Sequence, residues 1–229
     1  MIEKSSHYLG EKGGKYFEER FNDQQTFGIS YQSRYFTSFC NSDSVLLDFG
    51  CGDGTMLRLL PAAKKFGVEI NPHCHKKIHE LNHGLSNPIN IFDSIYLIGD
   101  NSVDVVISNH CIEHIPNPFE ALCQIRRVLV PGGKFVMVTP FDDWRQKGYN
   151  NWKRGDRHNH LYTWSPMNIG NLLSEAGFDV HDVRLSTFAW SPKLFWIHRL
   201  FGEFPFRMAC HLLSRLIHRR EIYSLASKP

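Results

Sequence analysis

The stretch Val45–Gly54, V-L-L-D-F-G-C-G-D-G, carries the strongest fold signal in this chain. Its apolar start is typical of a buried parallel strand, and that strand ends at an acid, Asp48. Three glycines then alternate: Gly50, Gly52 and Gly54. A turn of this kind exposes backbone N–H groups and lets a ligand approach the main chain closely. The sequence therefore predicts a nucleotide-type binding turn or, as the plainer alternative, a tight strand-to-helix turn without a ligand.

A second acid follows at a spacing that fits such a turn. The run Phe66–Pro72, F-G-V-E-I-N-P, is another short apolar segment and contains Glu69. Glu69 follows Asp48 by about 20 residues, the separation at which a second-strand carboxylate accepts hydrogen bonds from ribose hydroxyls. An isolated glutamate is more often a solvated loop residue, but its spacing from the glycine turn favours the ribose-binding interpretation.

Three further segments continue the alternation of strands and helices. Ile89–Phe92 is a predicted strand followed by the polar pair Asp93-Ser94, and Ser102–Asn109 is a predicted buried strand. Asn117-Pro118 begins a helix, because it offers a side-chain cap and a proline in the first turn. A V-P-G-G turn then leads into a fifth strand, Lys134–Thr139.

In this order the motifs resemble those of the class I S-adenosylmethionine-dependent methyltransferases. The resemblance rests on the compressed G-x-G-x-G turn, on N-H-C-I-E-H-I at residues 109–115 and on R-V-L-V-P-G-G at residues 127–133. A dinucleotide-binding oxidoreductase would need its third glycine where Thr55 stands. The strings V-E-I-N-P and H-L-Y-T-W-S-P are similar to a type 11-like bacterial group that acts on small molecules or glycans.

The resemblance implies a Rossmann-like, doubly wound α/β fold with a mostly parallel seven-stranded sheet and one antiparallel strand. Glu221–Ser227 is the expected seventh strand, antiparallel beside the fifth, and Phe178–Ser186 is the sixth. S-adenosylmethionine is the implied cofactor, and Asp93 is the candidate contact for the adenine amino group. The candidate cofactor-binding residues are Asp48, Gly50, Cys51, Gly52, Gly54, Glu69, Ile70, Asp93, Ser94 and Asn109.

A single methyltransferase domain is expected over residues 1–229, because the length and the 42% hydrophobic content suffice for one core. Within it, residues 1–40 form an N-terminal helical cover, residues 45–186 the Rossmann-like core, and residues 188–220 a helical insertion before the last strand. The N-terminal segment either covers the cofactor or packs against the sheet edge.

The polar loop at residues 141–160 follows the fifth strand and is expected to cover the substrate. A hydroxyl acceptor must lose its proton, and histidine is the side chain best suited to take it near neutral pH. The candidates are His160, His158 and His114, each with a structural role as the alternative. No metal is expected, because the H-x-H pairs at 73/75 and 158/160 have no matching cysteine or carboxylate set at a recognised spacing.

The segment 190–220 mixes aromatic and aliphatic residues with basic ones. Ordinary packing and capping is the favoured interpretation, and a dimer surface or a peripheral membrane contact are the alternatives. A net charge of +3 and the lack of a dense basic run argue against a nucleic-acid partner. Six cysteines without a C-x-x-C pair, together with an N-terminus without an apolar targeting segment, favour the cytoplasm.

We therefore expect an S-adenosylmethionine-dependent methyltransferase that acts on a small molecule or glycan, at an oxygen atom. The competing hypothesis is a non-catalytic nucleotide-binding protein of the same fold that regulates a partner. Asp48, the glycine turn and Glu69 are all present, which argues against a degenerate pocket.

Overall fold

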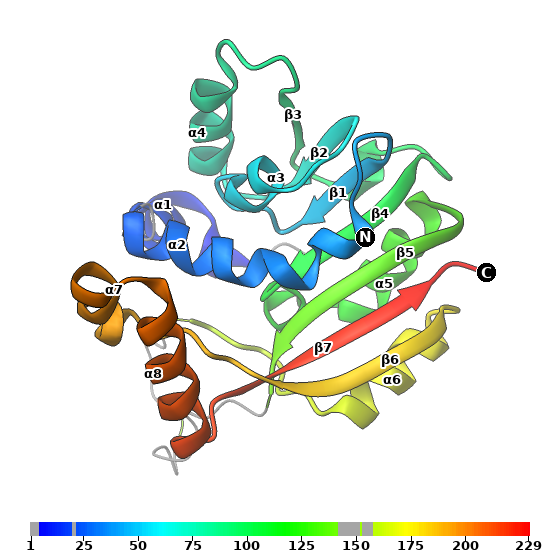
Figure 1. Ribbon diagram of the computed structural model, residues 1–229. Coiled ribbons are helices and arrows are strands. Elements are labelled where there is room, and N and C mark those ends of the chain that lie inside the picture. The colour runs from blue at the N-terminus through cyan, green and yellow to red at the C-terminus, as the bar shows by residue number, and fades with distance from the viewer. Residues whose placement is uncertain (1–4, 20–21, 142–151, 153–157) are drawn as a thin grey trace.

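The computed structural model of the chain describes residues 5–19, 22–141, 152 and 158–229 (Figure 1). Seven strands form one sheet in the order β3-β2-β1-β4-β5-β7-β6, in which β7 alone runs antiparallel to its neighbours β5 and β6. The predicted doubly wound sheet with one antiparallel strand is confirmed. The strands are β1 (Val45–Phe49), β2 (Lys64–Val68), β3 (Ile89–Phe92), β4 (Val103–Asn109), β5 (Leu129–Pro140), β6 (Asp179–Thr187) and β7 (Arg220–Ser227).

The central strands bury side chains on both faces of the sheet, because helices cover both faces. On β5, Phe135 and Met137 face one core while Val136 and Val138 face the other, as expected for the two-residue period of a strand. Near-continuous apolar runs are the consequence, and they explain why the strands could be recognised from the sequence.

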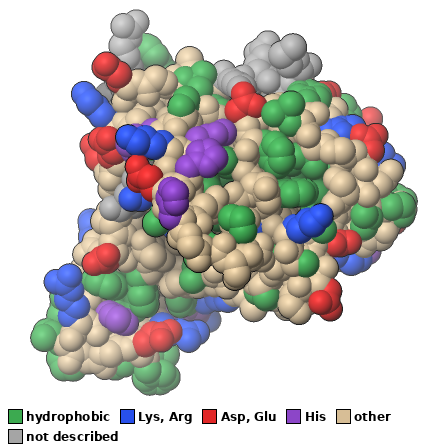
Figure 2. Space-filling view, turned by 90° about the horizontal axis from the view of Figure 1, so that it is seen from above, with side chains coloured by type: hydrophobic (Ala, Val, Ile, Leu, Met, Phe, Trp, Pro, Cys, Tyr) green, Lys and Arg blue, Asp and Glu red, His purple; other side chains and the backbone are tan. Residues whose placement is uncertain are grey.

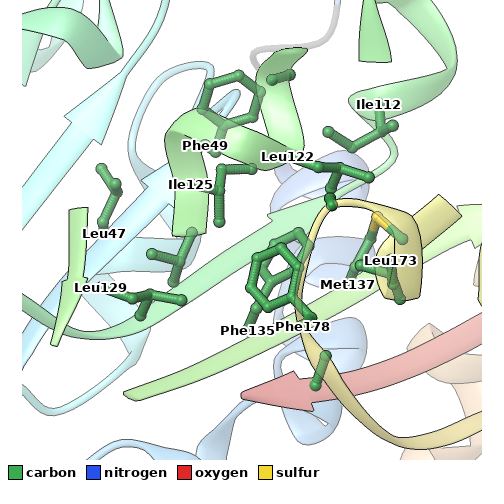
Figure 3. Close-up of a cluster of buried hydrophobic side chains, with 14 of the residues drawn as sticks. Leu47, Phe49, Ile112, Leu122, Ile125, Leu129, Phe135, Met137, Leu173 and Phe178 are labelled. Carbon is green, nitrogen blue, oxygen red and sulfur yellow. The ribbon is translucent and has the colours of Figure 1, made fainter. Parts of the chain in front are cut away.

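The helices divide between these two faces. Figure 1 shows α2 in front of the sheet and α5 and α6 behind it. The cluster drawn in Figure 3 lies on the α5 and α6 side, where Leu122, Ile125 and Leu173 pack against Phe135. The helices are α1 (Gly10–Glu18), α2 (Asp23–Gln32), α3 (Thr55–Leu59), α4 (Pro72–Asn82), α5 (Pro118–Val128), α6 (Pro166–Glu175), α7 (Phe195–Phe201) and α8 (Glu203–Leu216).

The predicted helix start at Asn117 is confirmed by its cap. The Asn117 side chain accepts a hydrogen bond from the backbone N–H of Glu120 at the start of α5. Ser165 and Asn168 form a capping box at the start of α6. The V-P-G-G segment differs from the prediction, because it lies within β5 and not before it. The pairing of β5 with β4 shifts register there, which accommodates the extra residues and the positive φ of Gly132.

Helices α7 and α8 form a separate apolar cluster with α2. Trp190, Phe195, Phe206 and Cys210 are its buried members, and Phe27 of α2 packs against them. The segment between β6 and β7 therefore packs against helix α2. The strand order reverses between β1 and β4, and in open α/β sheets ligands bind outside the strand ends at such a switch point.

Candidate active site

A cavity of about 530 Å³ lies at the carboxyl ends of β1, β2 and β4. Its volume is typical of a site for a small ligand or cofactor. One end is lined by the glycine turn and Glu69, and the other end by Phe188 and Trp190 after β6. Tyr16 and Phe17 of α1 also line it, so the N-terminal helices form part of the wall.

The glycine turn shapes this cavity through its backbone torsions. Gly50, Gly52 and Gly54 have φ values of 86°, 53° and 74°, which side-chain-bearing residues adopt only with strain. A Cβ at Gly50 would lie 2.3 Å from the Sγ of Cys111. The turn therefore has to be glycine for steric reasons.

Four of the five N–H groups from Gly50 to Gly54 are hydrogen-bonded within the protein, so the turn offers fewer donors than the sequence predicts. The N–H groups of Gly50 and Cys51 donate to the carbonyl of Val68, and that of Gly52 donates to Glu69 Oε2 at 3.1 Å. Gly54 donates to the carbonyl of Cys51. The glycines let a ligand come close to the backbone, whereas these N–H groups stabilise the turn itself.

Asp48 is 3% exposed and lines the cavity, and its Oδ1 accepts no hydrogen bond from the described residues. Burial, with Glu69 and Asp53 nearby, raises the pKa of Asp48 to about 8. The side chain of the cofactor-free protein therefore holds its proton at neutral pH, and a ligand that brings a positive charge or an N–H group to Oδ1 would favour the ionised form.

Glu69 lies at the tip of β2 and is held by the backbone on both oxygens. Oε1 accepts from the N–H of Asn71 at 3.0 Å, while Oε2 accepts from the glycine turn. Burial raises the pKa of Glu69, and these backbone donors oppose that rise. Each carboxylate oxygen has two acceptor sites, so the side chain still has capacity for two ribose hydroxyls.

The remaining predicted cofactor residues divide into two groups. Ile70, Asp93, Ser94 and Asn109 line the cavity together with Asp48 and Glu69. Gly54 does not, because it lies beneath the turn, where an added Cβ would come within 2.7 Å of Ile89 Cδ1. Its place at the start of α3 makes it a packing residue of the turn.

Two ionisable residues that the sequence analysis did not select, His110 and Glu113, line the cavity after β4, and Glu221 of β7 lies beside His110. His110 Nδ1 lies 3.6 Å from Glu113 Oε1, and His110 Nε2 lies 3.4 Å from Glu221 Oε2. Burial alone lowers the pKa of His110, but the two carboxylates outweigh it and raise the pKa to about 9. Burial opposes ionisation of Glu113 too, yet the neighbouring His114 and His110 keep the pKa of that carboxyl below its usual value.

The three predicted catalytic histidines come together in the same cavity. The rings of His114 and His160 are 4.8 Å apart, and those of His158 and His160 are 6.1 Å apart. His114 comes from the turn after β4, whereas the other two lie at the end of the loop at 141–160. Residues 142–151 and 153–157 of that loop lie outside the described residues, so its predicted role over the substrate stays a prediction.

The sequence analysis missed residues that no motif marks, because only the fold brings them to the site. Tyr8, in the 3₁₀ turn Ser6–Tyr8, contacts His114 Nδ1 through its hydroxyl at 2.9 Å. Glu221 reaches His110 from the far end of the chain. Glu113 had a local signal, because it is the acid of the E-H pair in the post-strand motif.

The residues present fit S-adenosylmethionine on structural grounds. The cofactor carries a positively charged sulfonium and an amino group, which suit the unpartnered Oδ1 of Asp48. The ribose hydroxyls suit Glu69 at the tip of β2. The glycines of the turn leave space for the cofactor between Asp48 and Glu69.

Comparisons with known proteins agree with this site. The profile of a protein family described as "Methyltransferase domain" matches residues 25–183. Phosphoethanolamine N-methyltransferase 2 of Caenorhabditis elegans is 32% identical over 118 residues, which are 45% of this chain and 24% of that protein. The chain spans less than half the length of the curated relatives it matches, at 46%, 41% and 24%.

Solved structures share the fold. A chain from the complex between the Haloferax volcanii Trm112 methyltransferase activator and a methyltransferase has a TM-score of 0.67 and 17% identity, covering 100% of this chain and 99% of that one. Phosphoethanolamine N-methyltransferase 2 of Haemonchus contortus, in complex with S-adenosyl-L-methionine, has a TM-score of 0.64 and 17% identity, covering 98% of this chain and 58% of that one.

The family profile spans more than half of the chain and includes the glycine turn, Glu69 and the post-strand motif. The predicted family and its cofactor, S-adenosylmethionine, are therefore confirmed, and this chain belongs to the class I methyltransferases.

Proposed function

We propose that this protein transfers a methyl group from S-adenosylmethionine to a hydroxyl oxygen of a small molecule or glycan. The observation that carries the proposal is the placement of His114, His158 and His160 in the cavity that also contains the glycine turn and Glu69. Proton acceptors thus lie beside a cofactor-binding turn.

The chemistry needs few groups from the protein. S-adenosylmethionine supplies the methyl carbon, and the electron pair of the broken carbon–sulfur bond stays on sulfur as the acceptor oxygen bonds to that carbon. Asp48 and Glu69 hold the donor in line, which is where most of the rate enhancement of such a displacement arises. The acceptor's O–H proton passes to one of these histidines, which acts as the general base.

A nitrogen acceptor is the principal rival, because two of the relatives above are named phosphoethanolamine N-methyltransferases. We favour oxygen because an unprotonated amine needs no base to attack, whereas this cavity brings His114, His158 and His160 together. The regulatory, non-catalytic alternative finds no support among the described residues.

Incubation with methyl-labelled S-adenosylmethionine and a panel of sugars, phenols and amines tests the proposal. Mass spectrometry and the carbon chemical shift of the labelled methyl identify the acceptor atom. We expect an O-methyl product, and a product methylated only on nitrogen would overturn the oxygen assignment. His160→Ala should lower kcat by about 10²–10⁴ with little change in cofactor affinity.

The face formed by α7 and α8 supports a peripheral membrane contact. Phe204, Met208, Leu212 and Leu216 recur every four residues on α8 and are 59–74% exposed. Exposed arginines at positions 199, 207 and 215 lie among them. Figure 2 shows hydrophobic side chains beside Lys and Arg side chains on the lobe at the lower left, the side on which Figure 1 draws these helices.

An interfacial helix of this composition binds an anionic lipid surface through both its apolar and its basic side chains. Co-sedimentation with phosphatidylserine vesicles should be lost in Phe204→Glu/Met208→Glu, while phosphatidylcholine vesicles should bind weakly. A monomeric protein that binds neither kind of vesicle would refute this contact. A dimer that dissociates in the double variant would instead assign the face to self-association.

We place the protein in the cytoplasm. All six cysteines are free thiols in the structure, which suits a reducing compartment. Among the described residues, no helix combines the length and the hydrophobicity needed to cross a membrane. The division into one domain with an N-terminal cover and a helical insertion stays part of this proposal.

A further inference from the structure

Three side chains of metal-ligand type meet at the wall of the cavity, although they come from separate parts of the chain. Glu113 and His114 lie in the 3₁₀ turn after β4, and His160 is the last residue of the loop at 141–160. One ligand atom from each lies within 4.8 Å of the other two. The cofactor-binding turn uses other residues.

Glu113 is the least satisfied of the three. Its side chain has no exposed surface, and neither carboxylate oxygen accepts a hydrogen bond from the described residues. His110 is its ion-pair neighbour at 3.6 Å, but the second nitrogen of that imidazole faces Glu221. Glu113 shares this cationic neighbour with a second buried carboxylate and accepts no close hydrogen bond, so its Oε1 can still bind a ligand that carries positive charge.

The orientation of His114 is that of a metal ligand. The Tyr8 hydroxyl donates to the carbonyl of His158 at 2.5 Å, so its oxygen is left to accept from His114 Nδ1–H at 2.9 Å. The carbonyl of Asn159 lies 3.3 Å from the same nitrogen. With the proton held on Nδ1, the lone pair of neutral His114 is on Nε2, which lies 3.7 Å from Glu113 Oε1. Ligating histidines have this arrangement, with one nitrogen fixed by an oxygen acceptor and the other directed at the ion.

We propose that Glu113, His114 and His160 bind a divalent transition-metal cation at the acceptor end of the cavity. Two imidazoles and one carboxylate favour zinc, manganese or iron(II) over magnesium or calcium, which prefer oxygen ligands. Ligand atoms on a tetrahedral zinc ion are separated by roughly 3.3 Å, given bonds of about 2.0–2.1 Å. The Glu113–His114 separation is close to this value, and the His160 ring must move inward to complete the set.

This site deepens the proposed function and rests on it only for the identity of the acceptor. A cation with three protein ligands has an open position, and an acceptor hydroxyl bound there is more acidic than in water. The hydroxyl proton is released to solvent as the oxygen bonds to the methyl carbon. The cation is neither oxidised nor reduced.

The sequence predicted no metal because the H-x-H pair at 158/160 has no carboxylate near it in the chain. The structure supplies that carboxylate from Glu113, 45 or more residues earlier, and uses only His160 of the pair. The ligand set is therefore formed by the fold.

Metal binding can be tested without turnover. The purified protein is stripped with chelator and titrated with Co²⁺, whose visible absorption reports nitrogen and oxygen ligation, and with Zn²⁺ in a thermal-shift assay. We expect one ion per chain, a visible band, and a rise in Tm with Zn²⁺. Glu113→Gln and His160→Ala should each weaken Co²⁺ binding by at least about tenfold. His73→Ala is the matched control from the other H-x-H pair and should leave it unchanged.

His160→Ala removes a side chain that is only half-buried, so it keeps the test decisive if Glu113→Gln does not fold. A wild-type protein that takes up no Co²⁺ or Zn²⁺, or folded variants with wild-type affinity, would overturn the metal site. S-adenosylhomocysteine binding in the same samples separates the two proposals. If it persists while metal does not bind, the methyltransferase assignment stands and the histidines act as bases alone.

Discussion

Glu69→Ala is the substitution whose effect can be worked out most fully from the structure. The side chain accepts two backbone hydrogen bonds, from Gly52 and Asn71, and is placed to accept two more from the ribose. Leaving the two backbone N–H groups without a partner costs about 2 kcal/mol each, within the usual 1–3 kcal/mol for a buried donor. With about 2–4 °C lost per kcal/mol in a protein of this size, Tm should fall by roughly 8–16 °C.

Cofactor affinity should fall as well. Hydrogen bonds to a charged acceptor contribute about 1.5–3 kcal/mol each, so the loss of the ribose contacts should raise the Kd of S-adenosylhomocysteine by tenfold to more than a hundredfold. Calorimetry measures this Kd, and Glu175→Ala, an exposed acid on α6, is the control.

A double-mutant cycle separates the ribose contact from a general loosening of the turn. The second change is made in the ligand, by use of the 2′-deoxy analogue of S-adenosylhomocysteine. The wild type should bind the deoxy analogue more weakly, and Glu69→Ala should not discriminate between the two ligands. Equal discrimination by a folded Glu69→Ala protein would refute the ribose role and leave Glu69 as a support for the turn.

Three further predictions address Asp48, Gly50 and Ser165. Asp48 keeps its proton in the folded state to about pH 8 but loses it near 3.8 when unfolded, so unfolding releases a proton and the stabilisation is lost as pH rises through 8. Asp48→Asn should therefore raise the Tm of the cofactor-free protein more at about pH 9 than at about pH 6 while weakening cofactor binding, and a pH-independent effect would contradict this. Gly50→Ala should abolish S-adenosylhomocysteine binding in calorimetry, because its Cβ meets Cys111 at 2.3 Å, whereas Gly132→Ala has the same sign of φ without a clash and should bind normally. Ser165→Ala removes the capping box of α6 and should cost about 0.5–2 kcal/mol in denaturant unfolding, and no change would show that the box is dispensable.

The order of strands and the cofactor end of the cavity could be predicted because their signals are local. An apolar run, an acid and a glycine turn lie within Val45–Gly54, and each later strand end is marked by a polar residue such as Asp93 or Asn109. Parallel strands bring such ends to one edge, so residues distant in the chain could be grouped before the structure was known.

The acceptor end could not be predicted in the same way. Tyr8 fixes His114 across 106 residues, and Glu221 pairs with His110 only because β7 inserts antiparallel beside β5. Neither residue carries a motif. The donor role expected of the glycine turn is restricted because the N–H groups of Gly50, Cys51 and Gly52 donate to Val68 and Glu69, a pairing that depends on the approach of β2.

The measurement that tests the central claim most directly is calorimetric titration of the wild-type protein with S-adenosylhomocysteine and, separately, with NAD. Asp48, Glu69 and the glycine turn predict binding of S-adenosylhomocysteine with a Kd in the micromolar range and no heat of binding from NAD. Binding of NAD by a protein that does not respond to S-adenosylhomocysteine would contradict the assignment of this cavity to a methyltransferase.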